Sequence, residues 1–513
     1  MSTGLHTVHV RINDAATGQP TPVRIRFSAP AGEYFAPFGR LTDFATARYQ
    51  DVGGNVLLND RQYAHIDGTC EVYLPASPIV VEISKGPEYR PIRRDLSLGP
   101  GKLALRFAMD RWTDLRAQGW CSGDANALLP MPHAALLEGA AEDLAVINLL
   151  AREVKIKSAR RNRHRRAIPN ILAFSGQAPA LEVPGHLVVV NTQNYHRVLG
   201  SLGLLNCHRA VYPLTFGRRA GSNNWTLADW CDQCHRKDGL VVWTRGRRVH
   251  PPENITFLAS EALADLILGK VDAFEVANVG WCSAEMPEWY HLLNSGLKVT
   301  FVGASNKDSN LQMLGNVRTY AHLAPGQPLA YGNWIEAVRA GRTFLTNGPL
   351  LSLIVNGQEP GATLNLPAAG PVRIRAEAHC IEPFDALEVV ANGKIIASQT
   401  PAGSPPCAVI EMDWPMSAGG WLAARCWGKC EMQMVTPGDA PGAHTSPVYV
   451  CIGGQPMQPD PAAIGKLQAG LDYMLQWTAQ PGSFESERQR EKLLGIFQAA
   501  KNKLMGQQAG DPR

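Results

Sequence analysis

Short runs of apolar residues, several of them alternating with polar ones, fill the first 110 residues and predict β-strands. The runs are HTVHVRI, TPVRIRFSA, CEVYL, IVVEISKG and KLALRFAM, and Gly, Pro and Asp residues separate them. Short strands between turn residues are typical of all-β units. We therefore expect one or two sandwich-like β units over residues 1–110.

From residue 111 to residue 348 the pattern changes to alternating strands and helices. The run PHAALLEGAAEDLAVINLLAREV (132–154) has helical spacing and strong helix formers, so it predicts one long helix. Short apolar runs predict buried strands over 185–191, 239–244, 272–278 and 297–305, with helices between them over 226–236, 258–269 and 285–295. This alternation indicates a mainly parallel sheet or barrel, in which chemistry gathers at the carboxyl ends of the strands.

Strand patterns return in the last third of the chain. The runs LSLIVNG, PVRIRAEAHC, ALEVVANGKII and AVIEMDWPM predict a β-sandwich over 349–452. Residues 453–513 then predict a linker followed by two helices, over 461–479 and 483–505. The expected fold class is therefore multidomain, a central α/β region flanked by β-sandwich-like domains and followed by short C-terminal helices.

Composition narrows the class of protein. A length of 513 residues predicts three domains or more, and 45% hydrophobic with 18% charged residues is a globular composition. The N-terminus lacks a signal pattern and no apolar run approaches the roughly 20 residues that span a bilayer, so we expect a cytoplasmic protein without a membrane partner. Its eleven cysteines are then expected to be mostly free thiols, and the oligomeric state stays open.

Two local motifs suggest chemistry that the rest of the chain does not favour. CDQCHR (231–236) matches the pattern of c-type haem attachment, but that chemistry needs export, so we expect packed sulfurs and no haem. The run REVKIKSARRNRHRRA (152–167) carries eight Lys and Arg residues that could grip a phosphate backbone. The run has no interleaved aromatic residues, so we expect a solvated loop or a helix end there, and nucleic acid is not the favoured partner.

Polar residues at the predicted strand ends are the candidate site. Asp124, Asn126 and Leu128 alternate along one strand and share a face. A hydrolytic metal centre needs imidazole or carboxylate ligands there, and leucine offers no ligand atom. Other residues near strand ends could join Asp124 around one site: His186, His250, Glu275 and Asp308.

The order of motifs resembles that of CehA/McbA-like metallohydrolases, which belong to the PHP-type, amidohydrolase-like barrel superfamily. The resemblance covers roughly 112–360 and rests on GWCSGD, GHLVVVNTQ, DGLVVWT, DAFEVAN, LKVTFVGAS and WIEAVRAGRTFLTNGPLL. It implies a distorted PHP-like β/α barrel with metal ions at the carboxyl ends of the strands. The N-terminal segment is similar to transthyretin-like or carboxypeptidase-regulatory β modules.

This resemblance also shows where the chain departs from the family pattern. The opening family motif Gly-Asp-x-His-x-His here has Asn126 and Leu128 at the two histidine positions, and a late motif places Asn306 at an aspartate and Asp308 at a histidine. Arg245 stands where a histidine is expected, and His250 could replace that histidine only after a short insertion. The matches that remain are Asp124, His186 and Glu275.

Two functions follow from this pattern. One is a catalytically inactive or altered family member that acts as a binding module for a small molecule in the barrel mouth. The alternative is a hydrolase of ester, carbamate or amide bonds with one divalent ion, zinc, manganese or iron. In that alternative Asp124, His186, His250, Glu275 and Asp308 are the candidate ligands and His133 is the candidate proton-transfer residue.

Overall fold

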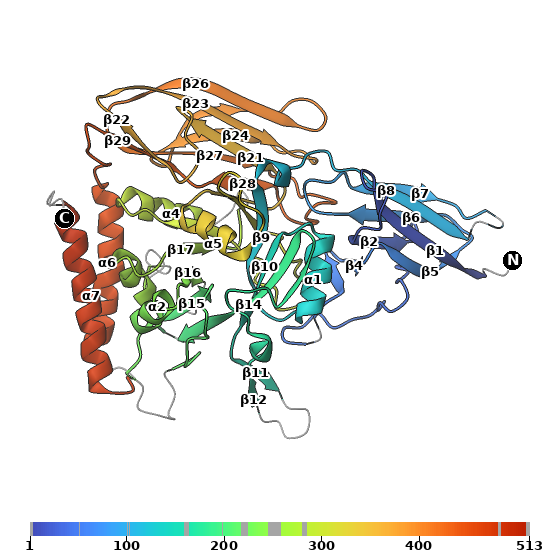
Figure 1. Ribbon diagram of the computed structural model, residues 1–513, viewed down its shortest axis with the longest axis horizontal. Coiled ribbons are helices and arrows are strands. Elements are labelled where there is room, and N and C mark those ends of the chain that lie inside the picture. The colour runs from blue at the N-terminus through green and yellow to red at the C-terminus, as the bar shows by residue number, and fades with distance from the viewer. Residues whose placement is uncertain are drawn as a thin grey trace.

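The computed structural model describes residues 4–508 apart from 51, 100, 102, 158–163, 197, 217–223, 245–257, 280–284 and 481–483. Two small N-terminal sheets lie at one end of the molecule and two long C-terminal helices at the other (Figure 1). The strands between them form a large mixed sheet, and a further antiparallel sheet covers it along one side.

The N-terminal strands form two sheets that share one apolar core. The first has the order β5-β1-β8 and the second the order β3-β4-β2-β6-β7. Val8, Val10 and Ile12 from one sheet pack with Ile25 and Phe27 from the other. The strands are β1 (Leu5–Asp14), β2 (Val23–Ser28), β3 (Asn55–Leu58), β4 (Arg61–Ile66), β5 (Thr69–Pro75), β6 (Ile79–Ser84), β7 (Ile92–Leu96) and β8 (Ala104–Met109).

The central sheet runs in the order β18-β17-β16-β15-β14-β10-β9-β19-β20 and mixes parallel with antiparallel pairs. Strands β9, β10 and β14 are parallel, as are β16, β17 and β18, whereas β14, β15 and β16 are antiparallel neighbours. The strands are β9 (Trp120–Ala127), β10 (Val146–Ala151), β14 (His186–His196), β15 (Gly200–Leu205), β16 (Leu240–Thr244), β17 (Ala273–Val276), β18 (Thr300–Gly303), β19 (Arg318–His322) and β20 (Thr343–Thr346), with β13 (Leu181–Val183) beside β14.

The described strands do not close into the predicted barrel. No ladder between β18 and β9 is formed among the described residues, and the loop directly after β18 reaches the end of β9 through the bridge Ala127↔Lys307 and the hydrogen bond from Asn306 N to Asn126 O. Strand β9 already pairs with β10 on one edge and with β19 on the other, so it has no free edge for β18. The sheet therefore remains open in the part of the chain that is described, although the loop after its edge strand β18 reaches the end of β9.

The long helix expected over 132–154 is also not formed. Helix α1 (Pro132–Ala141) has Glu142 as its C-cap, the chain turns at Asp143 with a φ of 55°, and β10 follows. All six residues of β10 are buried. A strand that is covered on both faces has an unbroken run of apolar residues, and such a run is also found in a buried helix. The apolar pattern of 146–151 therefore could not distinguish a strand from a helix.

The other predicted helices are present within a few residues of their expected bounds. They are α2 (Leu227–His235), α3 (Glu261–Ile267), α4 (Glu285–Asn294), α6 (Pro461–Ala479) and α7 (Glu487–Gln508). The described residues also form helix α5 (Tyr331–Arg339) and the short 3-10 helices η1 (Arg116–Gln118) and η2 (Ile171–Ala173). Helices α6 and α7 lie side by side and pack through Leu467 and Phe497 onto the central part of the molecule (Figure 1). Among the described residues, none of the helices combines the length and apolar character needed to cross a bilayer.

The basic run lies partly in a β-hairpin. Strands β11 (Val154–Lys157) and β12 (His164–Ala167) pair antiparallel, so the expectation of a helix end is wrong for the described part of the run. The turn between these strands lies outside the described residues.

The C-terminal strands form two layers, one of which continues the central sheet. Strand β20 pairs with β28, which extends the central sheet through β27, β24 and β25, while β21-β23-β26 form a separate antiparallel sheet above it. The strands are β21 (Leu350–Val355), β22 (Thr363–Leu366), β23 (Gly370–His379), β24 (Ala386–Ala391), β25 (Lys394–Gln399), β26 (Cys407–Met416), β27 (Gly420–Trp427), β28 (Gly442–Thr445) and β29 (Val448–Ile452). The expected sandwich thus shares a sheet with the central region.

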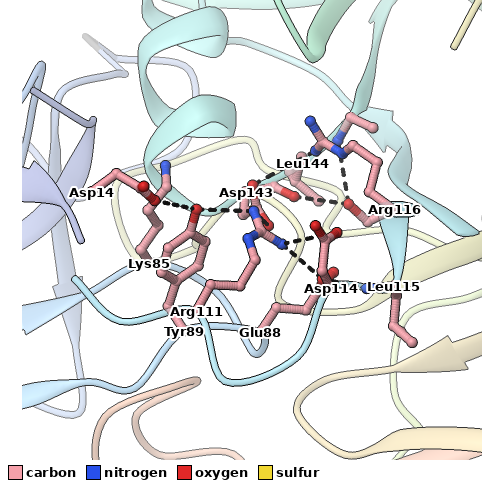
Figure 2. A network of polar contacts seen from close by, with 12 residues as sticks. Asp14, Lys85, Glu88, Tyr89, Arg111, Asp114, Leu115, Arg116, Asp143 and Leu144 are labelled. Carbon is pink, nitrogen blue, oxygen red and sulfur yellow. Dashed lines mark hydrogen bonds and ion pairs between the residues drawn. The ribbon is translucent and has the colours of Figure 1, made fainter. Parts of the chain in front are cut away.

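A buried ionic network joins the N-terminal sheets to the central sheet (Figure 2). Arg111 contacts Glu88 at 2.7 Å and Asp143 at 2.8 Å, and it donates to Tyr89, whose hydroxyl donates to Asp14. Burial alone would raise the pKa of Asp143, but Arg111 and neighbouring cations lower it below its ordinary value. Charge pairing therefore offsets desolvation where these two parts of the chain meet.

A second ion pair lies nearby. Arg24 Nε is 2.8 Å from Glu142 Oε1, both side chains are fully buried, and the same guanidinium donates to Met434 O and Val435 O. The pair connects a strand of the N-terminal sheets, the end of α1 and the C-terminal segment.

Candidate functional site

Asp124 lies near the carboxyl end of β9 and is fully buried. Its carboxylate accepts backbone N–H groups from Asn126 and Ser305 at 3.1 Å and from Gly315 at 2.9 Å. Burial raises the pKa of Asp124 above its ordinary value, although these hydrogen bonds oppose the shift. The aspartate thus fastens two loop segments to the end of β9.

Two side-chain amides bind both oxygens of Glu275. Asn126 Nδ2 donates to Glu275 Oε2 at 2.8 Å, and Asn306 Nδ2 donates to Oε1 at 2.9 Å. Asn126 Nδ2 also donates to Asn306 Oδ1 at 3.0 Å. Asn306 has a φ of 53°, a left-handed conformation that asparagine tolerates better than most residues. We call Asn126, Glu275 and Asn306 the amide–carboxylate cluster.

A second group of amides continues across the sheet from Asp124. Asn148 Nδ2 donates to the main-chain oxygen of Asp124 at 3.0 Å. Its Oδ1 accepts from Asn191 Nδ2 at 3.1 Å and from the Tyr331 hydroxyl at 2.7 Å. Asn126, Asn148 and Asn191 thus place neutral amides inside β9, β10 and β14, next to Asp124.

Lys307 adds a buried positive charge directly after Asn306. Its ammonium group lies 3.3 Å from Glu138 Oε2 and donates to Gln312 O at 2.5 Å. Both charged side chains are fully buried, and Glu138 also accepts the backbone N–H of Gly54 at 2.7 Å. Helix α1 and the loop after β18 are therefore held together by an ion pair beside the cluster.

A cavity of about 800 Å³ opens at these strand ends. Ser305, Asn306 and Asp308 line it from the loop after β18, and Leu128 lines it from the residue after β9. Leu128, at the position where the resemblance implies a metal-binding histidine, is thus part of the cavity wall. The remaining walls carry polar and aromatic residues: Arg48, Tyr49, Arg152, Glu153, Lys155, Tyr195, Thr215, Gln312 and Asn316.

Three basic side chains, Arg48, Arg152 and Lys155, line this cavity together with the acids Glu153 and Asp308. Arg48 Nε lies 3.2 Å from Asp308 Oδ2 and is largely exposed, at 72% of its side-chain surface. Arg152 lies over the Tyr195 ring, 4.9 Å from its centroid, and donates to Gln193 Oε1 at 3.2 Å. Burial raises the pKa of Asp308, while Arg48 and Arg152 act to lower it.

The structure places His186 away from this cavity. It stands at the start of β14, before the first register pair Val146↔Leu187, whereas Asn191 lies further along the same strand. Its Nδ1 is 2.6 Å from Leu144 O, and burial lowers its pKa to about 4 while Asp143 acts to raise it. His186 therefore neighbours the ionic network of Figure 2 and contacts none of the amide–carboxylate cluster by a described hydrogen bond.

The remaining predicted site residues are scattered or lie outside the described part of the chain. His133 is exposed in the first turn of α1, and Asp308 lines the cavity. His250 and Arg245 lie outside the described residues. Of the six predicted residues, Asp124 and Glu275 are brought together through Asn126.

The donor set around Asp124 and Glu275 does not fit the metal cluster that the resemblance implies. A metal ion needs ligand lone pairs directed at it. Here N–H groups occupy the carboxylates of both residues, and Asn126 Oδ1 is a buried oxygen without a partner in the described part of the chain. Among the described residues, neither carboxylate belongs to a set of three His, Cys, Asp or Glu ligand atoms within 4.8 Å of one another.

Several residues of the site could not be found from the sequence pattern. Arg48 comes from the N-terminal part of the chain and Arg152 from the end of β10, and both reach the cavity only in the folded chain. Lys307 was not predicted, because a lysine in GASNKDSN is typical of an exposed turn. Asn306 carried a signal, since it stands at the position of an expected aspartate.

No protein-family model matches the chain, and comparison with curated proteins finds no match. Among solved structures, one similar protein is a two-domain protein from Bacteroides vulgatus ATCC 8482 that contains a predicted PHP-like metal-dependent phosphoesterase. It is 12% identical, with a TM-score of 0.33, over 64% of this chain and 96% of that one. PsfC from Pseudomonas syringae PB-5123 is 13% identical, with a TM-score of 0.27, over 42% of this chain and 88% of its own. The likeness is weak and concerns at most a PHP-type fold, so the resemblance to CehA/McbA-like proteins stays a prediction.

Proposed function

We propose that the chain is a binding protein in which hydrogen-bonded amides take the place of a catalytic metal centre. The observation that carries this proposal is the pair of amide donors, Asn126 and Asn306, on the two oxygens of Glu275. Two N–H bonds at 2.8–2.9 Å engage one lone pair on each oxygen of Glu275, so an ion at this carboxylate would compete with both amides for its negative charge.

The ligand we propose is a small molecule with a carboxylate or phosphate group, bound in the cavity at the strand ends. Three cations, Arg48, Arg152 and Lys155, line the cavity beside two acids, Glu153 and Asp308. Arginine binds planar anions through paired N–H donors, and a volume of about 800 Å³ is ample for a small ligand.

Elemental analysis and activity measurements test the absence of a catalytic metal. The full chain is purified without chelator, and its metal content is compared with that of Glu275→Gln. We expect equal metal content in both proteins and no hydrolysis of an aryl ester or of bis(p-nitrophenyl) phosphate above the buffer rate. Metal that is lost together with hydrolysis in Glu275→Gln would instead establish the alternative, a metal-dependent hydrolase.

Calorimetry with citrate and with inorganic phosphate as probes tests the ligand class. Binding of either probe that weakens at least about tenfold in Arg152→Gln supports an anion site, since a charge-assisted contact contributes about 1.5–3 kcal/mol. Arg339→Gln is the control, because Arg339 lies on α5 and does not line the cavity. No binding of either probe, or equal weakening by both variants, contradicts the proposed ligand class.

A further inference from the structure

Glu377, His379 and Cys407 form a second group of ligating side chains, in the three-stranded sheet β21-β23-β26 (Figure 1). One ligand atom from each of the three residues lies within 4.8 Å of the other two. All three side chains are only partly buried, so the group is open to solvent. It belongs to a different sheet from Asp124 and Glu275.

The antiparallel register explains why these residues meet. His379 on β23 is directly opposite Cys407 on β26, and Glu377 precedes His379 by two residues. Residues two apart on a strand share a face, and directly opposed residues have Cβ atoms about 4.5–5.5 Å apart. The alternate residues Ala376 and Ala378 are buried, so the three ligands lie on the outer face of the sheet.

The distances are close to those of a zinc site. Cys407 Sγ lies 3.8 Å from His379 Nε2, and Glu377 Oε1 lies 2.5 Å from the same nitrogen. With Zn–S of about 2.3 Å and Zn–N and Zn–O of about 2.0–2.1 Å, tetrahedral ligand atoms would be roughly 3.6 Å and 3.3 Å apart. Both distances to His379 Nε2 are therefore within about 1 Å of the zinc geometry, and the distance between the carboxylate oxygen and the sulfur is within 4.8 Å.

Neighbouring side chains hold the ligands in this arrangement. Arg375 donates to Glu377 Oε2 at 2.9 Å, which leaves Oε1 directed at His379. The Trp112 ring lies beside the His379 ring, with 6.3 Å between their centroids. A carboxylate oriented by an outer hydrogen-bond donor is a common feature of zinc sites.

We propose that Glu377, His379 and Cys407 bind one zinc ion, with water in the fourth position. The mixed oxygen, nitrogen and sulfur donors suit zinc better than magnesium or calcium, which prefer oxygen ligands alone. Binding converts the Cys407 thiol to a thiolate and releases its proton to solvent. Because the ion joins β23 to β26, it stabilises the three-stranded sheet.

Cobalt titration of the full chain tests this site. The protein is stripped of metal with a chelator, kept reduced and titrated with Co²⁺, which gives a thiolate-to-cobalt absorption band only when a cysteine is a ligand. We expect a band that saturates at one equivalent and disappears when Zn²⁺ is added. Cys407→Ser should abolish the band, and His379→Gln should weaken zinc binding by at least about tenfold, since even outer-sphere partners contribute that much.

Two control variants separate this site from other metal binding. Cys430→Ser removes an exposed cysteine outside the group and should leave the band unchanged. Glu275→Gln should also leave it unchanged, so the outcome is independent of the proposed function. Absence of the band in the unmodified chain, or its persistence in Cys407→Ser, would overturn the zinc site.

Discussion

Replacing Asn126 with aspartate tests whether the amide–carboxylate cluster depends on a neutral donor. The amide of Asn126 donates to Glu275 at 2.8 Å and to Asn306 at 3.0 Å, and its side chain is fully buried. Asn126→Asp keeps the size of the side chain, removes both donors and places a second carboxyl beside that of Glu275. The variant therefore isolates the effect of hydrogen bonding and charge from that of packing.

The expected loss follows from these contacts. A hydrogen bond to a charged group contributes about 1.5–3 kcal/mol and a neutral one about 0.5–1.5 kcal/mol, so the two together contribute roughly 2–4 kcal/mol. Repulsion between two carboxylates at about 4 Å adds up to about 4 kcal/mol at an effective dielectric constant of about 20, unless one takes up a proton. We expect the free energy of unfolding to fall by about 4 kcal/mol or more at pH 8.

The loss should be smaller at acidic pH. The introduced carboxyl has a folded-state pKa above its unfolded value, because burial and the neighbouring carboxylate both disfavour its charge. The folded variant therefore binds more protons than the unfolded one between these two pKa values, and its stability relative to the parent chain rises as pH falls. Urea unfolding followed by circular dichroism at pH 8 and pH 5 measures this difference.

A reciprocal variant provides the control. In Asn126→Asp with Glu275→Gln, the donor and the acceptor exchange places, and the glutamine amide can donate to the introduced carboxylate. We expect the double variant to regain at least half of the stability lost by Asn126→Asp, which appears as a coupling energy in the double-mutant cycle. An Asn126→Asp protein as stable as the parent at pH 8, or a double variant without recovery, would refute the role of these hydrogen bonds.

Three further predictions concern the framework of the site. Burial lowers the pKa of His196 from 6.5 to about 4, so between these pH values the unfolded chain binds more protons than the folded one and stability falls as the pH falls. His196→Asn should therefore make the urea midpoint less dependent on pH in this range. In Gly123→Ala the new Cβ would lie 2.7 Å from an indole ring, so the free energy of unfolding should fall by about 1–3 kcal/mol. Gly332→Ala on α5, where the added Cβ meets open space, is the control and should not lower stability in thermal melts. Arg24→Met removes the guanidinium from the fully buried Glu142, which keeps its 3.1 Å contact to His65, and should lower the free energy of unfolding by about 3 kcal/mol. Arg90→Met breaks an exposed pair and should lower it by less than about 1 kcal/mol, so equal effects in urea unfolding would contradict this.

The local pattern of apolar and polar residues was sufficient to predict the secondary structure of segments whose burial pattern matches one type of element along their length. The strand predicted over 185–191 lies within the longer β14 (His186–His196), and the helix predicted over 461–479 is α6, because apolar runs and helical spacing reflect which residues are buried. The same reasoning failed at 146–151. That strand is covered on both faces, and its apolar run followed a true helix without a glycine or proline to separate them.

The sequence by itself determined that the histidines of the implied metal motif are missing at 126 and 128, because that statement needs only residue identities. What replaces them was decided by the tertiary structure, since Asn126, Glu275 and Asn306 are separated by up to 180 positions and meet only where the loop after β18 reaches β9. The meeting of His379 with Cys407 likewise depends on the register of two strands. Chemistry along one strand can be read from the sequence, whereas chemistry between strands depends on which edges pair and in which register.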